Sequence, residues 1–253
     1  MLQRIDRFCD AVPRTWATAS DLGPLRLFTR TGSGWPFYAR PIPGGAPVTR
    51  PDIERVRERQ RELRVPESFE WVLAAAPSMA GAAEAAGLGV TICPLLVLDG
   101  DPVPARFPPG YTARLLGPAD GDLQSALHAL HSVAAAAFGA MPPRAPSEAE
   151  LAGFRADLAA GRIARALVVG PDGPVAAGSA QRHGDVVELV GIGTAAAARG
   201  RGIGAAVTAL LASAATAAGA DLVFLAAGDA GATRVYERVG FRRVGECAVA
   251  EPG

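Results

Sequence analysis

Hydrophobic positions in the second half of the chain follow two different periods. Leucines at positions 123, 127 and 130 repeat every three to four residues, which predicts an amphipathic helix over residues 122–138. Residues 111–116 before it are expected to form a strand. Ser147 and Glu150 have the spacing of a capping box, so a second helix is expected from there to about Ala160.

Three hydrophobic segments then follow one another, separated by short polar turns. They cover residues 163–169, 175–181 and 186–192, and the intervening Pro-Asp-Gly and His-Gly-Asp turns are short enough to require antiparallel pairing. A helix (202–218), a strand (222–227), a helix (231–239) and a strand (241–250) complete the order βααβββαβαβ. This order predicts an α/β domain.

The first half shows a weaker form of the same pattern. Strands are expected at residues 25–29, 36–41, 69–73 and 90–98, and helices at 52–63 and 79–86. When Gly87 is aligned with Gly240, Cys93 falls near the position of Cys247, and the order helix, strand, helix, glycine, strand repeats. We infer a degenerate internal repeat. A proline- and glycine-rich linker at residues 99–110 predicts two domains, residues 1–105 and 106–253.

Composition excludes several function classes. The 253 residues are 49% hydrophobic, enough for a buried core, and the 25 basic and 25 acidic residues balance, which favours neither nucleic acid nor a membrane as partner. Mixed charges over residues 54–64 predict a solvated helix face. The sequence contains no lysine, so Schiff-base chemistry and a lysine-containing phosphate loop are excluded. With its many alanines, this points to a bacterial source.

The cysteines and histidines indicate neither disulfides nor a metal site. Three widely spaced cysteines lack metal-ligand spacing, and residues 1–14 have no apolar signal core, so a reducing cytoplasm is the expected location. His128 and His131 share a predicted helix without a third ligand, and His183 lies in a turn. We expect structural roles for all three histidines.

The glycine-rich run Arg199-Gly200-Arg201-Gly202-Ile203-Gly204 lies between a predicted strand and a long apolar helix. A helix N-terminus presents unpaired N–H groups and the positive end of a dipole, and glycines let a phosphate approach the backbone closely. The run therefore predicts a backbone cradle for a pyrophosphate.

Two motifs together resemble the GNAT superfamily of acyl-CoA N-acyltransferases. The run matches Arg/Gln-x-x-Gly-x-Gly/Ala, and the segment Tyr236-Glu237-Arg238-Val239-Gly240-Phe241 matches Tyr-x-x-x-Gly-Phe. The resemblance covers residues 111–250, including the element order. It implies the GNAT fold, an α/β architecture with a mixed, mostly antiparallel twisted sheet flanked by helices, preceded by a smaller degenerate GNAT-like α/β domain.

The resemblance also implies a site for acetyl-CoA. The run from Arg199 to Gly204, with Ala205 opening the helix, would bind the pyrophosphate, and Ile192, Gly193 and Thr194 would bind the pantetheine arm on a strand edge that splays from its neighbour. Gly191 and Gly193 suit a bulge there. The cofactor-binding residues implied are Ile192, Gly193, Thr194, Arg199, Gly200, Arg201, Gly202, Ile203, Gly204, Ala205, Asp229 and Tyr236.

Glu188 and Tyr236 are the catalytic candidates that the resemblance assigns. Glu188 would deprotonate an amine, directly or through water, and Tyr236 would protonate the departing thiolate. Glu188 is equally consistent with an ordinary polar strand position. For Tyr236 the alternative is a packed helix aromatic, and the catalytic role is favoured. Asp229 stands where relatives often have a coenzyme-contacting asparagine, and Ala196 replaces a frequent proline.

The expected activity is direct transfer of acetyl from acetyl-CoA to a primary amine of a small molecule or peptide, by a monomer or homodimer. A non-catalytic acyl-CoA sensor or scaffold is the alternative. Dinucleotide binding at residues 191–196 is disfavoured, because its helix would start near Gly193 and run through three further glycines.

Two further expectations concern the first half. Only one strand is predicted after Gly240, so we expect the first half to supply or cover the missing sheet edge. One coenzyme site per chain is expected, because the first half lacks the glycine run.

Overall fold

The computed structural model describes residues 1–32, 34, 36–139 and 143–253. Within them the chain divides into two units, and neither unit is a single stretch of sequence. Unit 1 comprises Met1–Leu95, Ala226–Asp229 and Arg243–Gly253, and unit 2 comprises Leu96–Leu225 and Ala230–Arg242. The proposed division of the chain at residue 105 stays a prediction.

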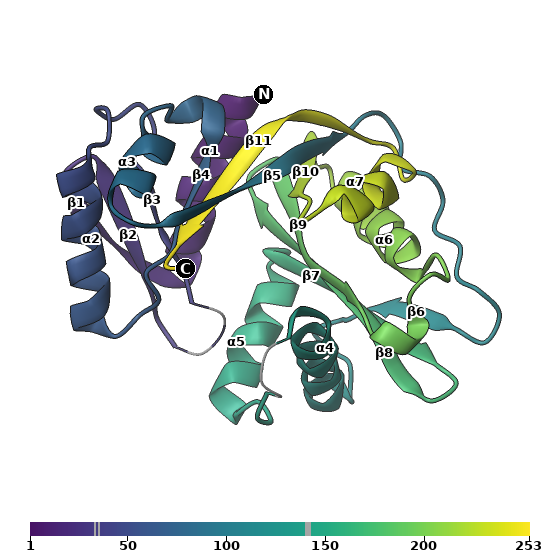
Figure 1. The fold of residues 1–253 in the computed structure, drawn as a ribbon. Helices are drawn as coiled ribbons and strands as arrows, with labels where there is room; N and C mark the ends of the chain where they lie inside the picture. Colours follow the sequence, from purple (N-terminus) through teal and green to yellow (C-terminus); the bar gives the residue numbers. More distant parts are fainter. Residues whose placement is uncertain (33, 35, 140–142) are drawn as a thin grey trace. The chain divides into compact units, whose positions relative to one another are not determined.

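Unit 1 is a sheet with helices on both faces (Figure 1). Its helices are α1 (Leu2–Ala11), α2 (Arg50–Leu63) and α3 (Met79–Ala85), and its strands are β1 (Ala17–Leu22), β2 (Leu25–Arg30), β3 (Ala39–Pro41), β4 (Phe69–Val72), β5 (Gly89–Leu98) and β11 (Phe241–Glu251), of which the last two also extend into unit 2. The hydrogen-bonded order is β1-β2-β3-β4-β11-β5. Among the strand pairs of this unit whose register is described, β3 and β4 are parallel, and β1–β2, β2–β3 and β4–β11 are antiparallel.

The two faces of the unit 1 sheet differ in character. Ile53 and Val56 of α2 pack with Phe69, Trp71 and Met79 in an apolar core. On the α1 face, Arg40 is fully buried and donates to the Asp6 carboxylate. Burial raises the pKa of Asp6, and the charge of Arg40 opposes that rise.

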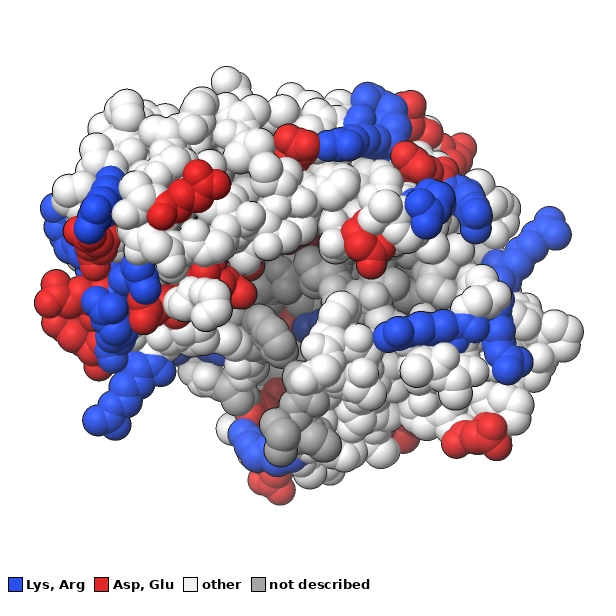
Figure 2. Space-filling model, in the orientation of Figure 1, with Lys and Arg blue, Asp and Glu red and all other residues white. Residues whose placement is uncertain are grey.

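The outer surface of α2 carries both signs of charge, as the sequence predicts. Figure 2 shows arginines and acidic residues interspersed over this helix. Exposed pairs such as Arg50–Glu54 and Arg59–Glu62 join them at 2.7 Å and 2.8 Å. Such pairs contribute little to stability, so the face is a solvated one.

Unit 2 has the same layered plan (Figure 1). Its elements are β6 (Thr112–Leu115), α4 (Leu123–Phe138), α5 (Glu148–Ala159), β7 (Ile163–Gly170), β8 (Gly173–His183), β9 (Val186–Thr194), α6 (Ile203–Ala217), β10 (Leu222–Ala226) and α7 (Ala230–Glu237). The order is β5-β10-β9-β8-β7-β6. β9 and β10 are parallel, whereas β6, β7, β8 and β9 form the expected antiparallel meander.

Helices cover opposite faces of the unit 2 sheet. Ala177 of β8 belongs to the apolar cluster of α4 and α5. A Cβ on the next residue, Gly178, would lie 2.8 Å from Val207 and 2.9 Å from Leu211 of α6. Because successive strand residues point to opposite faces, α4 and α5 cover one face and α6 the other.

The predicted element order from residue 111 onward is confirmed, and so is the capping box of α5, in which the Ser147 hydroxyl accepts from the Glu150 N–H. The helix α1, the strand β1 and the short 3₁₀ turns were not predicted. The strand expected over residues 36–41 is shorter, because it begins at Ala39. In the described chain no helix has the length and apolar character needed to cross a membrane.

The strand order shows what stands at the missing edge. β5 comes from the first half of the chain, yet it lies beside β10, where the Ala227 N–H donates to the Pro94 carbonyl at 2.9 Å. β11 comes from the second half and pairs with β4, from Cys247↔Val72 to Ala250↔Phe69. The last strand of each half therefore lies in the sheet next to a strand of the other half. This agrees with the expectation that the first half supplies the missing sheet edge.

Candidate functional site

A fork between β9 and β10 is the first feature of the site. In the described residues, the register pairs Leu222 with Val186, Val223 with Val187 and Phe224 with Glu188. β9 nevertheless continues to Thr194, so residues 189–194 extend beyond this ladder. Backbone groups that leave a ladder need another partner, and a ligand is one such partner.

A β-bulge shapes β9 just beyond the fork. Ser179 pairs with Val190 and Ala177 with Gly193, so β9 carries one extra residue, and Gly191 has φ 62°. The predicted bulge is thus present. Gly193 is needed for packing, because a Cβ there would lie 2.7 Å from the Ala137 Cβ of α4.

The glycine run reaches an uncapped helix. A 3₁₀ turn (Ala196–Ala198) follows β9, and Gly200 and Gly202 have φ 75° and 78°, which favours glycine at both positions. Gly202 is the N-cap of α6, and within the described chain no side chain caps this terminus and no acidic residue lies in its first turn. A Cβ at Gly200 or Gly202 would meet no atom within 4 Å. The first turn of α6 thus lacks a side-chain partner, and the glycines before it leave room beside the backbone, which fits an anion such as a pyrophosphate.

The Arg199 side chain connects this loop to β9 and α4 through hydrogen bonds to two backbone carbonyls. Its Nε donates to the Thr194 carbonyl at 3.1 Å and its Nη2 to the Ala137 carbonyl at 3.5 Å. The first carbonyl ends β9 and the second lies in the last turn of α4, where the helix dipole favours a cation. This arrangement gives Arg199 a positioning role that the motif does not reveal. Arg201 is exposed.

Glu188 and Tyr236 lie on different elements of unit 2. Glu188 is half-buried at the fork, opposite Gln181 on β8 and Phe224 on β10. Tyr236 is a half-buried residue in the last turn of α7, and its ring centroid lies 6.4 Å from that of the buried Phe241. Asp229 is exposed and directly precedes α7.

The dinucleotide alternative is excluded by the position of α6. Residues 195–202 form the 3₁₀ turn and the glycine loop, and the helix begins only at Ile203. A helix from Gly193 would have placed three further glycines in its interior, each costing about 1 kcal/mol.

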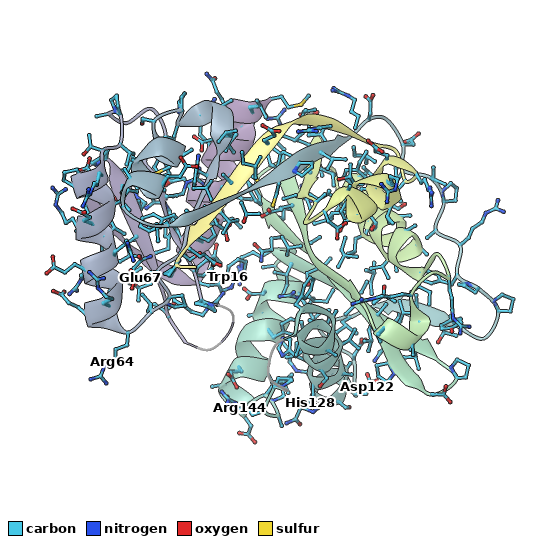
Figure 3. All side chains as sticks on the ribbon, in the orientation of Figure 1. Trp16, Arg64, Glu67, Asp122, His128 and Arg144 are labelled. Carbon is cyan, nitrogen blue, oxygen red and sulfur yellow. The ribbon has the colours of Figure 1, made fainter. Side chains whose placement is uncertain are left out.

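His128 and His131 lie on α4 (Figure 3 labels His128). Burial lowers the pKa of His131, and the positive charge of Arg165 lowers it further. Among the described residues, no group of three or more histidines, cysteines or acidic residues is placed to hold a metal ion.

The element order, the forked and bulged β9 and the uncapped α6 define the class of the fold as GNAT-like. Residues 128–241 match the family described as Acetyltransferase (GNAT) family. This segment is a GNAT acetyltransferase domain.

Solved structures extend the similarity to the whole chain. The chain is similar to a GCN5-related N-acetyltransferase from Kribbella flavida, with 25% identity, a TM-score of 0.75, and coverage of 100% of this chain and 96% of that one. A GCN5-related N-acetyltransferase from Sphaerobacter thermophilus has 21% identity and a TM-score of 0.58 over 80% of this chain and 68% of that one. No curated protein matches this chain.

A tandem GNAT protein from the clavulanic acid biosynthesis pathway shares the fold, with 17% identity and a TM-score of 0.55 over 89% of this chain and 77% of that one. Because neighbours cover the full chain, the first half is GNAT-like as well. The predicted two-domain GNAT architecture is confirmed.

Proposed function

We propose that this protein is an N-acetyltransferase that moves the acetyl group of acetyl-CoA directly to a primary amine. The observation that carries the proposal is the fork of β9 and β10 followed at once by the uncapped N-terminus of α6. An extended thioester arm needs free strand-edge groups, and a pyrophosphate needs converging N–H donors. Both stand here along one continuous stretch of backbone.

Each part of the coenzyme has a proposed binding segment in this chain. Residues 192–194 would bind the pantetheine arm along the strand edge, and residues 200–205 the pyrophosphate. Arg199 would hold the loop through its two carbonyl contacts, and exposed Arg201 would add positive charge. Asp229, which directly precedes α7, would also contact the coenzyme.

The chemistry requires three proton transfers. Glu188 accepts a proton from the acceptor ammonium, directly or through water, so that the amine lone pair can attack the thioester carbonyl. A backbone N–H at or near Ile192 stabilises the oxyanion. When the C–S bond breaks, the Tyr236 hydroxyl protonates the thiolate. The new amide nitrogen loses its second proton, which restores the Tyr236 hydroxyl through water, and the products are the N-acetylated amine and the free coenzyme thiol.

Two measurements test this proposal. Acetyl-CoA should bind in a calorimetric titration, whereas NAD should not, and amines should release free thiol from acetyl-CoA in proportion to enzyme. Binding without thiol release against a broad amine panel would favour the alternative, a non-catalytic acyl-CoA sensor or scaffold. Failure of acetyl-CoA to bind would overturn both.

The proposal includes a setting and a class of acceptor. We place the protein in a bacterial cytoplasm, as a monomer or homodimer acting on a small-molecule or peptide amine. The balanced charge supports acceptors other than nucleic acids and membranes.

A further inference from the structure

The last strands of the two halves run in opposite directions beside each other. β5 and β11 are neighbours in the sheet (Figure 1), and the Asp99 N–H, just after β5, donates to the Gly240 carbonyl, just before β11, at 3.0 Å. At the other end, a Cβ placed on Gly89 would lie 3.7 Å from the Glu251 carbonyl oxygen. The start of each strand therefore lies beside the end of the other, as in an antiparallel pair.

Each of these strands carries one cysteine, and the two occupy matching positions. Cys93 comes four residues after Gly89, and Cys247 comes four residues before Glu251. In an antiparallel pair these equal steps lead to residues that lie opposite each other. The Cys247 thiol donates to the Cys93 carbonyl at 3.7 Å, so two residues 154 positions apart in sequence are in contact. Both belong to unit 1.

Both cysteine side chains point to the α1 face of the unit 1 sheet. Ala248 lies in the apolar core under α2, so its neighbour Cys247 points to the opposite face. Val90 of β5 packs against the same core, so Cys93, three residues later, also points to the opposite face. Opposite residues that share a face of a sheet bring their side chains together.

The geometry of such a pair suits a disulfide. Opposite residues of antiparallel strands have Cα atoms about 4.5 to 5.5 Å apart, and disulfides join Cα atoms that are about 4.4 to 6.8 Å apart. None of the three cysteines is in a disulfide in this structure. Cys93 and Cys247 are both half-buried, so part of each residue is open to a small oxidant.

We propose that Cys93 and Cys247 are a modification site, at which a hydroperoxide forms an intrachain disulfide that joins β5 to β11. One thiolate attacks the peroxide, the O–O bond breaks, and a sulfenic acid forms while the leaving alkoxide takes up the proton that the thiol lost. The second thiol then attacks the sulfenic sulfur, and its proton leaves with the hydroxide as water. Two thiols and one hydroperoxide give one disulfide, one alcohol and one water, so the sulfurs are oxidised and the peroxide is reduced.

The surroundings of the pair make this reaction slow at neutral pH. Burial raises the pKa of Cys93, and the negative charge of Glu70 raises it further, so little of the reactive thiolate is present. The pair therefore stays reduced until an oxidant accumulates. Once formed, the disulfide closes a loop across 154 positions, and the closure of long loops restricts the unfolded chain most. This inference does not depend on the proposed function.

The test maps the cysteines of the full-length protein after oxidation with hydrogen peroxide. Cleavage at arginine places each cysteine in its own peptide, residues 8–14, 65–106 and 244–253. After remaining thiols are blocked with N-ethylmaleimide, mass spectrometry without reductant should find peptide 65–106 joined to peptide 244–253, and dithiothreitol should separate them. The thermal midpoint of the oxidised protein should rise by about 5 °C or more.

Three variants provide the controls. Cys9→Ser should form the link as the wild type does, because Cys9 lies on α1 and not on either strand. Cys93→Ser and Cys247→Ser should form no intrachain disulfide, and oxidation should not raise their thermal midpoints. If one of these two does not fold by circular dichroism, the alanine variant at that position replaces it, and the wild-type peptide map decides the proposal in either case.

Several results would overturn the proposal. One is a link that includes Cys9 or that joins two chains, which size-exclusion chromatography under non-reducing conditions detects. Another is oxidation of Cys93 and Cys247 singly to sulfinic acid without a link. A third is recovery of all three thiols after peroxide treatment that oxidises glutathione in the same solution.

Discussion

The two halves of the chain begin their corresponding helices in opposite ways. In α2 the Asp52 carboxylate accepts from the Thr49 hydroxyl at 2.5 Å and from the Thr49 N–H at 3.0 Å. These hydrogen bonds lower the pKa of Asp52, which keeps a negative charge at the helix terminus. In α6 the N-cap is Gly202, and its first turn has no acidic residue within the described chain.

The difference between the capped α2 and the uncapped α6 shows what leaves a helix N-terminus available to a ligand. Both termini carry the same backbone donors and the same dipole. In α2 the protein's own side chains satisfy the donors, and a carboxylate takes the place that an anion would fill. In α6 the glycines leave them to a ligand, so a shared fold supports one proposed coenzyme site instead of two.

Removing the first half should have the largest effect. Deleting residues 1–105 removes β5 and exposes the edge of β10, where the Ala227–Pro94 hydrogen bond lies. We expect little soluble protein and no cooperative unfolding transition, because an unpaired edge in the sheet aggregates. Expression, size-exclusion chromatography and circular dichroism measure this. A soluble, active fragment would show that unit 2 does not need β5.

Tyr236→Phe tests the residue that most clearly differs between the halves. When Gly87 is aligned with Gly240, the position four residues earlier is Tyr236 in the second half and the buried Ala83 in the first. Losing the hydroxyl should lower kcat by about 10²-fold or more, as general acids contribute, with the acetyl-CoA Kd unchanged. Steady-state kinetics and calorimetry separate the two quantities. An unchanged kcat would remove Tyr236 from the mechanism.

Placing an aspartate at the N-terminus of α6, as in α2, should have a smaller effect than the loss of the Tyr236 hydroxyl. Ala205 occupies in α6 the third helical position that Asp52 occupies in α2. Ala205→Asp should weaken acetyl-CoA binding about tenfold or more while leaving thermal stability equal or higher, because the carboxylate competes for the same N–H donors.

The reciprocal variant is the control. Asp52→Ala should cost about 1 kcal/mol of the free energy of unfolding, the usual value of a cap, and leave the acetyl-CoA Kd unchanged. Urea unfolding and calorimetry give both numbers. If Ala205→Asp binds acetyl-CoA as tightly as the wild type does, the N–H groups at the start of α6 do not bind the pyrophosphate.

The smallest expected effect concerns pH. Burial raises the pKa of Glu70 to about 7, with Arg40 opposing and Glu251 adding to the rise. A carboxyl whose folded pKa is raised binds a proton more tightly when folded, so its contribution to stability is lost as pH rises from its unfolded value, near 4.5, through 7. Burial also raises the pKa of Asp6, which acts in the same direction.

Glu70→Gln should therefore flatten the dependence of the urea midpoint on pH between 5 and 8. The exposed Glu62→Gln is the matched control and should preserve the wild-type slope. Acetyl transfer at a fixed pH should be the same in Glu70→Gln as in the wild type, in contrast to Glu188→Gln, which should lose it. If the urea midpoint of Glu70→Gln depends on pH as steeply as that of the wild type, groups other than Glu70 cause this dependence.

Much of unit 2 was predictable because its signals are local. The short turns at residues 171–173 and 183–185 fix an antiparallel meander, and the Ser147–Glu150 box fixes the start of α5. The glycines of the run require the positive φ that the structure shows at Gly200 and Gly202. The role of Arg199 was not predictable, because its two carbonyl partners belong to β9 and to α4, which lies 62 residues away in sequence.

Spacing within a few residues predicted the order of the elements from residue 111 onward, the position of the glycine run before α6 and the repeat in the two halves, but it missed α1 and β1. The positions of β5 beside β10 and of β11 beside β4, and the end of the β9–β10 ladder at Glu188, follow from tertiary contacts. Strand partners and register are set by contacts between residues far apart in the chain, and no local pattern carries that information.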